Sequence, residues 1–307
     1  MLYLYTLDQP ERYLRLLQDA LPGEIIACWP QEVDAAAVTH AAVWAPPDGF
    51  FAQFPNLRTV FVMGAGVDKL LQRNDVPEDV TLIRLTDAGM AQQMTEYCLV
   101  GLLHYQRQMD RYAQQQRDRQ WKPLDTRLAR DVRVGILGHG ELGGRVAQDL
   151  VRLGYQVSGW SRRPRQVENV RCLHGEAGLR ELLPQTDVLF CVLPSTPETR
   201  HLLDAETLAL LPDDVALINA GRGSLIDEDA LLARLDGGRL RFALLDVFAE
   251  EPLPENHPFW THPRVIITPH VAADTVHEEA VAQIAGNMHA LARGEPVTGR
   301  VDRQRGY

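Results

Sequence analysis

The sequence predicts an α/β fold made of two doubly wound parallel sheets. Short apolar runs rich in branched side chains alternate with helix-like runs along almost all of the 307 residues. Strands buried on both faces of a parallel sheet have that composition. A long helix-like stretch, residues 89–121, separates the strand-like runs into two sets. Repeated alternation of strand and helix produces open parallel sheets with right-handed crossovers.

The individual elements follow from these runs. The first set of strands is expected at residues 2–6, 24–29, 41–45, 57–64 and 80–85, and the second at residues 132–138, 155–160, 187–193, 214–220, 241–247 and 264–270. Residues 89–121 lack proline and are expected to form one long helix that leads from one domain into the other and packs on a second subunit. A last helix is expected at about 276–293. We therefore predict one domain at 99–277 and a second built from 1–98 plus 278–307.

Composition excludes several classes of protein. The net charge is −10, which argues against nucleic acid as the main partner, because phosphate neutralisation needs a basic face. No apolar run approaches the length of a membrane span, and the N-terminal residues are typical of a first strand rather than a signal peptide. The cysteines are scattered, which favours reduced core thiols in a cytoplasmic protein; they are Cys28, Cys98, Cys172 and Cys191. No clustered set of metal ligands is present, so no metal is expected.

A glycine motif directly follows the strand-like run "VRVGILG". Gly138, Gly140 and Gly143 match GxGxxG at a junction of strand and helix. These glycines permit a tight turn, close approach of a pyrophosphate, and close packing of helix on strand. The N–H groups at the helix start, assigned to Glu141 and Leu142, would then face the phosphates. The motif predicts a Rossmann-type NAD(P)-binding domain, and the alternative is a glycine-rich turn that binds no ligand.

The next strand-like run ends in "WSRRPR", where a carboxylate is usual in this motif. An acidic residue about 20 positions after the glycines would bind a ribose 2′-hydroxyl, and it would repel a 2′-phosphate. This chain instead has Ser161, Arg162 and Arg163, which can donate hydrogen bonds to a phosphate. The pattern favours NADP(H) over NAD(H). A basic loop exposed to solvent is the alternative interpretation.

Three polar residues follow later strand-like runs. Arg222, Glu251 and His270 are 48 positions apart at most, but the carboxyl ends of parallel strands meet at one edge of a sheet. This set suits reduction of a 2-oxo acid, with Arg holding the substrate carboxylate and polarising the carbonyl. His would donate the proton, and Glu would orient the imidazole and favour its protonated form. Each residue alone would be interpreted as structural, and only the set indicates chemistry.

Longer strings carry a family resemblance over essentially the whole chain. "GILGHGELGGRVA", "NAGRGSLIDEDAL", "ALLDVFAEEPLP" and "VIITPHVAA" resemble the D-isomer-specific 2-hydroxyacid dehydrogenases. "QQMTEYCLVGLLHYQR", "WKPL", "WSRR" and "GEPVTGRVDRQRGY" are similar to the bacterial glyoxylate/hydroxypyruvate reductase A group within that family. The resemblance implies a flavodoxin-like substrate domain beside the Rossmann-type domain, with the active site in a cleft. Related NAD-dependent members carry an acid where this chain has Ser161, so their cofactor preference is not carried over.

The resemblance also implies roles for single residues. Arg222, Glu251 and His270 match the catalytic trio of the family, and Asp246 would contact the nicotinamide carboxamide. The cofactor would be lined by Leu193, Pro194 and Ala220. The substrate carboxylate would be bound by N–H groups of Ala65 and Gly66 in "VMGAGVDKL", beside Arg222 and His270. Trp44 is expected either to wall the pocket or to pack in the core, and Trp121 to reach a partner subunit.

The expected function is therefore the NADPH-dependent reduction of glyoxylate to glycolate and of hydroxypyruvate to D-glycerate. NADH is the less favoured cofactor, and a homodimer is the expected assembly. Two alternatives stay open at this point. The same trio would serve a reductase of a bulkier 2-oxo acid such as phenylpyruvate. A protein that senses NADP(H) without catalysis could use the same fold, although a sensor has no need of a proton donor.

Overall fold

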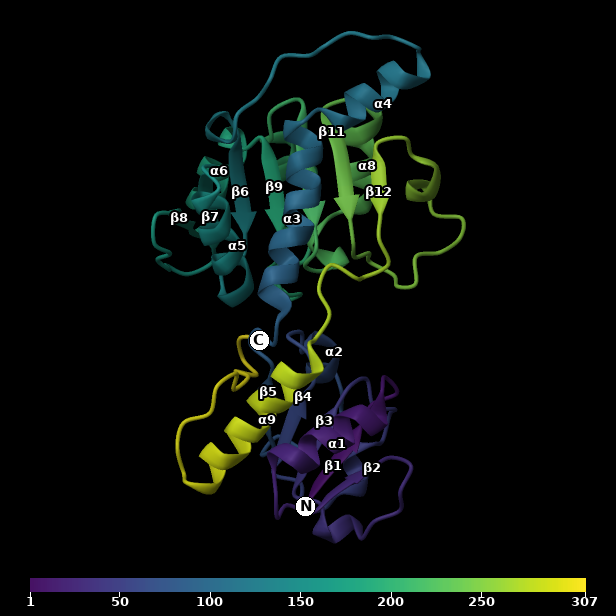
Figure 1. Cartoon of the computed structure of the whole chain (residues 1–307), viewed down its shortest axis with the longest axis vertical. Coiled ribbons are helices and arrows are strands. Elements are labelled where there is room, and N and C mark those ends of the chain that lie inside the picture. The colour runs from purple at the N-terminus through teal and green to yellow at the C-terminus, as the bar shows by residue number, and fades with distance from the viewer. The chain divides into compact units, whose positions relative to one another are not determined.

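The computed structural model describes residues 1–307 and divides into two compact units (Figure 1). Unit 1 comprises Met1–Met90 and Thr275–Tyr307, and unit 2 comprises Ala91–Asp274. The chain therefore passes from unit 1 to unit 2 and back again. Each unit contains one parallel sheet, so the predicted fold class is confirmed. No helix has both the length and the apolar character needed to cross a membrane.

Unit 1 is built on a five-stranded parallel sheet in the order β2-β1-β3-β4-β5. The strands are β1 (Leu2–Tyr5), β2 (Ile26–Cys28), β3 (His40–Val43), β4 (Thr59–Val62) and β5 (Thr81–Arg84). The helices are α1 (Pro10–Ala20), α2 (Asp68–Leu71) and α9 (His277–Ala292), with short 3₁₀ turns at Ala35–Ala37 and Phe51–Gln53. Each predicted strand run of this set overlaps one observed strand, and only β3 begins outside its run, at His40.

Helix α9 completes unit 1 although it comes last in the chain. It packs beside α1, where Arg12 pairs with Glu278 at 2.6 Å and the ring of Tyr13 lies 4.4 Å from that of His277. Gln283 of the same helix accepts a hydrogen bond from the backbone N–H of Thr86 at 3.1 Å. The first 90 residues thus rely on a C-terminal helix to cover their sheet.

Unit 2 is built on a seven-stranded parallel sheet in the order β12-β11-β10-β9-β6-β7-β8. The strands are β6 (Arg133–Leu137), β7 (Gln156–Ser161), β8 (Arg171–His174), β9 (Val188–Cys191), β10 (Val215–Asn219), β11 (Leu240–Leu245) and β12 (Val265–Ile267). The direction of strand order reverses between β6 and β9, and ligands of such sheets bind at the carboxyl ends of the strands beside that switch point. The sequence did not predict β8, because this edge strand is half exposed and lacks an apolar run.

The helices of unit 2 cover both faces of its sheet. They are α3 (Met90–Gln106), α4 (Met109–Arg117), α5 (Glu141–Arg152), α6 (Gly175–Leu182), α7 (Ala205–Ala209) and α8 (Glu228–Asp236), and short 3₁₀ turns lie at Ala129–Asp131, Leu183–Gln185, Gly223–Leu225 and Pro258–Thr261. One core cluster contains side chains of α3 and α5, and another contains those of α6, α7 and α8. Neighbouring strand residues such as Ile136 and Leu137 enter different clusters, as the alternation of side chains across a sheet requires.

The expectation of one helix over 89–121 is wrong. The chain breaks between α3 and α4 at Gln108, which is buried and has a left-handed φ of 57°. Its side-chain amide donates to the carbonyl of Asp125 at 2.8 Å, so a contact 17 residues away holds the bend. The periodicity of apolar residues cannot reveal this bend, because it depends on a left-handed glutamine and on a carbonyl distant in the sequence.

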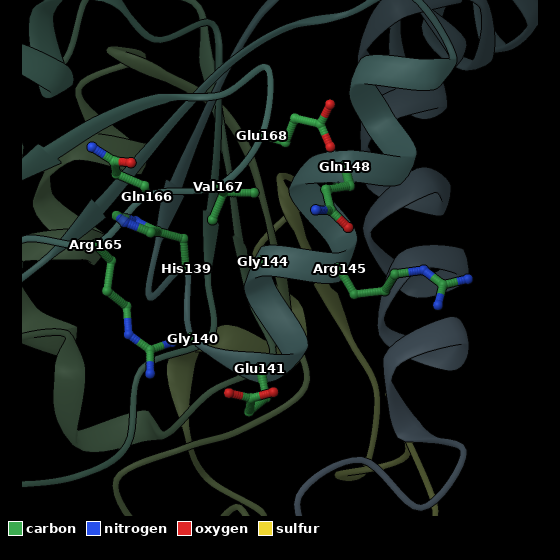
Figure 2. Close-up of a pocket in the computed structure, with 10 residues that line it drawn as sticks. All are labelled: His139, Gly140, Glu141, Gly144, Arg145, Gln148, Arg165, Gln166, Val167 and Glu168. Carbon is green, nitrogen blue, oxygen red and sulfur yellow. The ribbon is translucent and has the colours of Figure 1, made fainter.

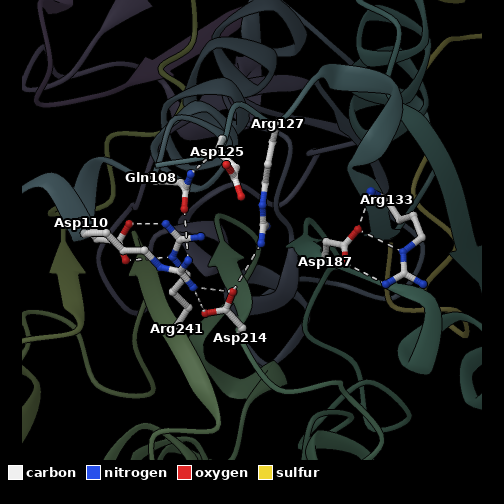
Figure 3. A network of polar contacts seen from close by, with 9 residues as sticks. Gln108, Asp110, Asp125, Arg127, Arg133, Asp187, Asp214 and Arg241 are labelled. Carbon is white, nitrogen blue, oxygen red and sulfur yellow. Dashed lines mark hydrogen bonds and ion pairs between the residues drawn. The ribbon is translucent and has the colours of Figure 1, made fainter. Parts of the chain in front are cut away.

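Ion pairs tie α4 and the segment that follows it to the amino-terminal edge of the seven-stranded sheet (Figure 3). Asp110 accepts two hydrogen bonds from the buried guanidinium of Arg241, one of them at 2.8 Å. Asp214 pairs with Arg111 at 2.8 Å and with Arg127 at 3.8 Å. Arg127, Asp214 and Arg241 precede or begin strands, so the network lies at the edge opposite to the carboxyl ends.

Candidate active site

The glycine loop between β6 and α5 leaves no room for a side chain at Gly138 or Gly143. Gly138 has a φ of +102°, a region that L side chains rarely adopt. A Cβ added to Gly143 would stand 2.0 Å from the carbonyl oxygen of Gly138. Helix α5 then begins at Glu141, and its N-cap, Gly140, makes no side-chain cap. The first N–H groups of a twelve-residue helix therefore face outward at the carboxyl edge of the sheet, which is the arrangement that binds phosphate.

A pocket opens beside this loop (Figure 2). Its lining residues come from the loop, from α5 and from the segment after β7: His139, Gly140, Glu141, Gly144, Arg145, Gln148, Arg165, Gln166, Val167 and Glu168. Figure 2 shows the side chain of Arg165 running down toward Gly140. A Cβ built on Gly140 would lie 3.6 Å from Nη1 of Arg165. This arginine, which the sequence argument did not assign to the site, therefore adds a cation next to the helix N-terminus.

The loop after β7 carries the residues predicted to select the cofactor. Ser161 ends the strand, and its hydroxyl donates to the carbonyl of Arg163 at 2.7 Å. Arg162 pairs with Glu198 at 2.8 Å, which joins this loop to the one that follows β9. Arg163 and Arg165, on either side of Pro164, are exposed. Three guanidinium groups thus lie within five residues of the strand end.

Glu251 and His270 form a pair at the carboxyl ends of β11 and β12. Nδ1 of His270 lies 2.8 Å from Oε2 of Glu251, while Oε1 of Glu251 accepts the backbone N–H of Phe248 at 3.0 Å. A carboxylate only accepts hydrogen bonds, so Nδ1 carries the proton toward Glu251 and Nε2 is left for another partner. The His270 side chain is 49% exposed, which makes Nε2 accessible to a substrate.

Arg222 stands between two glycines that the packing requires. A Cβ on Gly221 would lie 2.8 Å from the carbonyl oxygen of Leu193, and one on Gly223 would lie 1.8 Å from the carbonyl carbon of Phe248. The loops after β9 and β11 thus close on either side of this turn. Nη1 of Arg222 donates to the carbonyl of Gly221 at 2.7 Å. Arg222 follows β10, and Glu251 follows β11. These two strands are neighbours in the sheet.

Buried residues at the same strand ends complete this edge of unit 2. Asp246, directly after β11, is 1% exposed. Its carboxylate accepts the backbone N–H groups of Val271 and Ala272, each at 2.9 Å. Leu193 and Ala220 are buried at the ends of β9 and β10, and Pro194 follows Leu193. The strand ends therefore bring most of the predicted residues of this unit to one edge.

In unit 1, the turn between β4 and α2 contains Gly64, Ala65 and Gly66. The indole of Trp44, which follows β3, rests on this turn, and a Cβ on Gly64 would lie 2.4 Å from its Cζ3. Trp44 is 50% exposed, so it does not pack in the core. Ala65 and Gly66 are partly exposed beside it. The small residues and the indole together form one surface.

Three further residues at this site could not be assigned from the sequence. Thr268 donates to Oδ1 of Asp246 at 2.6 Å, and the hydroxyl of Tyr97 lies 2.6 Å from that of Thr268. Glu198, the partner of Arg162, was also not assigned. Tyr97 and Thr268 each lie in a string that carries the family resemblance, but they are 171 positions apart and nothing in the sequence indicates that they are in contact. Only "PET" after the strand could have drawn attention to Glu198.

Comparisons with known proteins place the chain in a family. The sequence model described as D-isomer specific 2-hydroxyacid dehydrogenase, NAD binding domain, matches residues 99–272. A Photorhabdus laumondii protein named glyoxylate/hydroxypyruvate reductase A is 42% identical, covering 100% of this chain and 99% of that protein. The predicted resemblance is thereby confirmed.

Solved structures support the same family assignment. A D-isomer specific 2-hydroxyacid dehydrogenase from Xanthobacter autotrophicus in complex with NADPH and MES superposes with a TM-score of 0.96 at 41% identity, covering 100% of this chain and 99% of that one. An NADPH-dependent glyoxylate/hydroxypyruvate reductase from Sinorhizobium meliloti in complex with NADP and sulfate gives a TM-score of 0.92 at 35% identity over the same shares. With this match of sequence and fold over its whole length, the chain belongs to the D-isomer-specific 2-hydroxyacid dehydrogenase family.

Proposed function

We propose that the protein is an NADPH-dependent reductase that converts glyoxylate to glycolate and hydroxypyruvate to D-glycerate. The observation that carries the proposal is the pair formed by Glu251 and His270, at the same sheet edge as the glycine loop. A proton donor and a dinucleotide site at one edge are what hydride reduction of a carbonyl needs. Full-length relatives named for this activity and the NADPH in a structural neighbour support the assignment.

The loop after β6 fits a dinucleotide. Gly138, Gly140 and Gly143 make the backbone approachable, and the N–H groups of Glu141 and Leu142 at the start of α5 would bind the pyrophosphate. When bound, NADPH supplies the hydride. The nicotinamide half would lie against Leu193, Pro194, Ala220 and Arg222, with Asp246 at its carboxamide. The segment 99–277 is then the dinucleotide-binding domain.

Selection of NADPH over NADH is assigned to the loop after β7. Ser161, Arg162 and Arg163 would bind the 2′-phosphate, since a hydroxyl and guanidinium groups suit a dianion. Glu198 already orients Arg162 across this loop at 2.8 Å. With no acid at the strand end, binding of a free ribose 2′-hydroxyl lacks its usual acceptor.

The chemistry of the substrate falls to three side chains of unit 2. Arg222 would bind the carboxylate of the 2-oxo acid and polarise its carbonyl. Nε2 of His270 would give a proton to the carbonyl oxygen, while Glu251 keeps Nδ1 engaged and stabilises the imidazolium. After the transfer, the same pair takes its proton back from water.

We assign substrate binding in the other domain, 1–98 plus 278–307, to the turn of Ala65 and Gly66. Their N–H groups would bind the substrate carboxylate, and Trp44 would wall the pocket. Relatives named for glyoxylate and hydroxypyruvate favour two- and three-carbon acids over phenylpyruvate.

A homodimer in the cytoplasm is the proposed form of the enzyme. Val100 and Leu103 of α3 are 62% and 44% exposed, and Trp121 is 99% exposed, which supports a covered apolar face. The four cysteines are free thiols, as a reducing compartment would keep them. Light scattering at micromolar concentration tests the dimer, and a monomer would refute it.

The decisive experiment measures NADPH and NADH oxidation with glyoxylate, hydroxypyruvate and phenylpyruvate. We expect turnover with the two small acids, a preference for NADPH, and loss of that preference in Arg162→Ala plus Arg163→Ala. His270→Ala should abolish turnover while NADPH still binds. Turnover of phenylpyruvate alone would replace the substrate assignment. Full activity of His270→Ala would remove the proposed proton donor, and NADPH binding without any turnover would support a sensor.

A further inference from the structure

Helix α3 holds the segment that carries His270 by two side chains one helical turn apart. Gln93 donates to the carbonyl of Asp274 at 2.7 Å and accepts the N–H of the same residue at 3.0 Å. Four positions later, the hydroxyl of Tyr97 lies 2.6 Å from that of Thr268. Residues at i and i+4 share one face of a helix, so α3 anchors both ends of 268–274.

The direction of the hydrogen bonds at Thr268 follows from the chemistry of its partners. The buried carboxylate of Asp246 accepts from Thr268 and from two backbone N–H groups. Because a carboxylate cannot donate, the Thr268 hydroxyl must donate its single proton to Asp246. Its oxygen must then accept from Tyr97. Burial raises the pKa of Tyr97 well above its usual range, so the phenol remains a donor.

The turn that these groups surround is strained. His270 has a φ of 56°, a left-handed conformation that a residue with a side chain rarely adopts unless its surroundings enforce it. Its N–H donates to the carbonyl of Asp246 at 2.9 Å, and the next two N–H groups donate to the carboxylate of the same residue. Asp246 thus accepts the N–H groups of three successive residues of the turn.

We propose that Tyr97, acting through Thr268 and Asp246, is a positioning residue that aims Nε2 of His270 at the reacting oxygen. The chain of hydrogen bonds fixes the strained turn, and the turn fixes the imidazole that Glu251 holds on its other side. The inference rests on the proposed role of His270. The hydroxyl of Tyr97 would then contribute to the reaction, and this contribution is separate from the packing of its ring against the core.

The test compares two tyrosines whose hydroxyls have different partners, Thr268 for Tyr97 and Gln106 for Tyr155. Tyr97→Phe keeps the ring and removes the donor to Thr268. Tyr155→Phe is the matched control, because the Tyr155 phenol also bonds to a side chain of α3, Gln106, and its ring belongs to the same core cluster. Thr268→Val removes the relay hydroxyl at nearly constant shape, and Thr268→Ser restores it.

We expect Tyr97→Phe and Thr268→Val to lower kcat about tenfold, since small misplacement of a catalytic group is costly. The Kd for NADPH, measured by fluorescence, should stay within about twofold, because the glycine loop is untouched. Thr268→Ser and Tyr155→Phe should keep kcat near wild type.

A second readout needs no turnover. In ¹⁵N-histidine-labelled protein without cofactor, the ring nitrogens of His270 report the proton on Nδ1. We expect this signature to weaken in Tyr97→Phe and to persist in Tyr155→Phe. If Tyr97→Phe keeps both kcat and the ring signature, the inference is wrong. If its loss of kcat equals that of Tyr155→Phe, the effect is only structural, and the inference also fails.

Failure of the proposed function gives a different result. If His270→Ala retains turnover, the proton donor itself is misassigned, whatever Tyr97→Phe does. If His270→Ala is inactive and Tyr97→Phe is normal, the donor stands and only the positioning role is refuted. Should Thr268→Val fail to fold, Tyr97→Phe with the Thr268→Ser control still decides the outcome.

Discussion

Glu251 makes its two hydrogen bonds through different oxygens, which separates its effect on folding from its effect on the reaction. Oε1 accepts the N–H of Phe248, and Oε2 accepts from His270. Glu251→Gln keeps an oxygen for Phe248 and removes the charge beside the imidazole. We expect kcat to fall about tenfold or more, because the protonated donor loses its stabilising anion. The free energy of unfolding should change by less than about 1 kcal/mol.

Steady-state kinetics with hydroxypyruvate and urea unfolding measure the two effects of Glu251→Gln. The neighbouring Glu250 is exposed and supplies the control, since Glu250→Gln should change neither quantity. An unchanged kcat in Glu251→Gln would show that the charge beside His270 is dispensable.

Two adjacent glycines of α5 differ in the space around them. A Cβ on Gly143 would collide with the carbonyl of Gly138 at 2.0 Å, whereas the nearest atom to one on Gly144 is 3.6 Å away. We expect Gly143→Ala to cost about 1–3 kcal/mol of stability and to weaken NADPH binding more than tenfold, because helix and strand must separate. Gly144→Ala should be neutral or stabilising by up to about 1 kcal/mol.

Thermal unfolding and NADPH titration of these two variants are the measurements. Tight NADPH binding by Gly143→Ala would contradict the requirement for close approach at this position. A loss of binding in Gly144→Ala equal to that in Gly143→Ala would mean that the effect comes from the helix rather than from the contact.

At the scale of elements, α4 depends on one buried ion pair. Arg241 is 3% exposed at its side chain, and Asp110 at the start of α4 is its anionic partner. Asp110→Asn leaves the guanidinium buried without a counter-charge, and we expect a loss of about 3 kcal/mol in the free energy of unfolding. Asp213→Asn is the control, because its pair with Arg239 is 62% exposed on both sides and should contribute less than about 1 kcal/mol.

The same pair makes stability depend on pH. Burial raises the pKa of Asp110, but the hydrogen bonds and charge of Arg241 outweigh burial, so the pKa lies below its usual value. The unfolded chain, with a carboxyl pKa of about 3.9, then takes up the proton first as pH falls. The contribution is complete above that value and is lost as pH falls through the folded-state pKa. Urea unfolding should show the gap between wild type and Asp110→Asn closing from pH 7 to pH 3; a constant gap would contradict this.

The elements also show which features a sequence reveals. Strands such as β9 and β10 were predictable because both of their faces are buried and their runs are continuously apolar. Edge strand β8 and the bend at Gln108 depend on partial exposure and on a distant carbonyl, and neither leaves a local pattern. Glu251 and His270 could be paired in advance because parallel strands end at one edge. The contact of Tyr97 with Thr268 could not, since it depends on how α3 lies on the sheet.

At the scale of the whole molecule, the two units differ in continuity. Unit 2 is one uninterrupted segment, Ala91–Asp274, with core clusters on both faces of its sheet. Unit 1 is assembled from both ends of the chain. We expect a fragment of residues 91–274 to fold alone and to bind NADPH, and a fragment of residues 1–90 to remain unfolded because it lacks α9.

Circular dichroism and NADPH fluorescence of the two fragments test this difference. Adding a separate peptide of residues 275–307 to the first fragment should restore part of its structure, since Gln283 and Glu278 supply contacts to Thr86 and Arg12. A cooperative melt of residues 1–90 alone, or an unfolded fragment 91–274, would contradict the expectation.

The return of the chain to unit 1 has a consequence for biosynthesis. The strands of unit 1 leave the ribosome first, yet α9, which covers them, is translated last. At about 5–20 residues per second, the nascent sheet waits on the order of ten seconds or more for its final helix. Throughout that interval the apolar surface of the sheet remains exposed, while unit 2 can already fold. The amino-terminal segment is therefore the part of the nascent polypeptide with the greatest need of a chaperone.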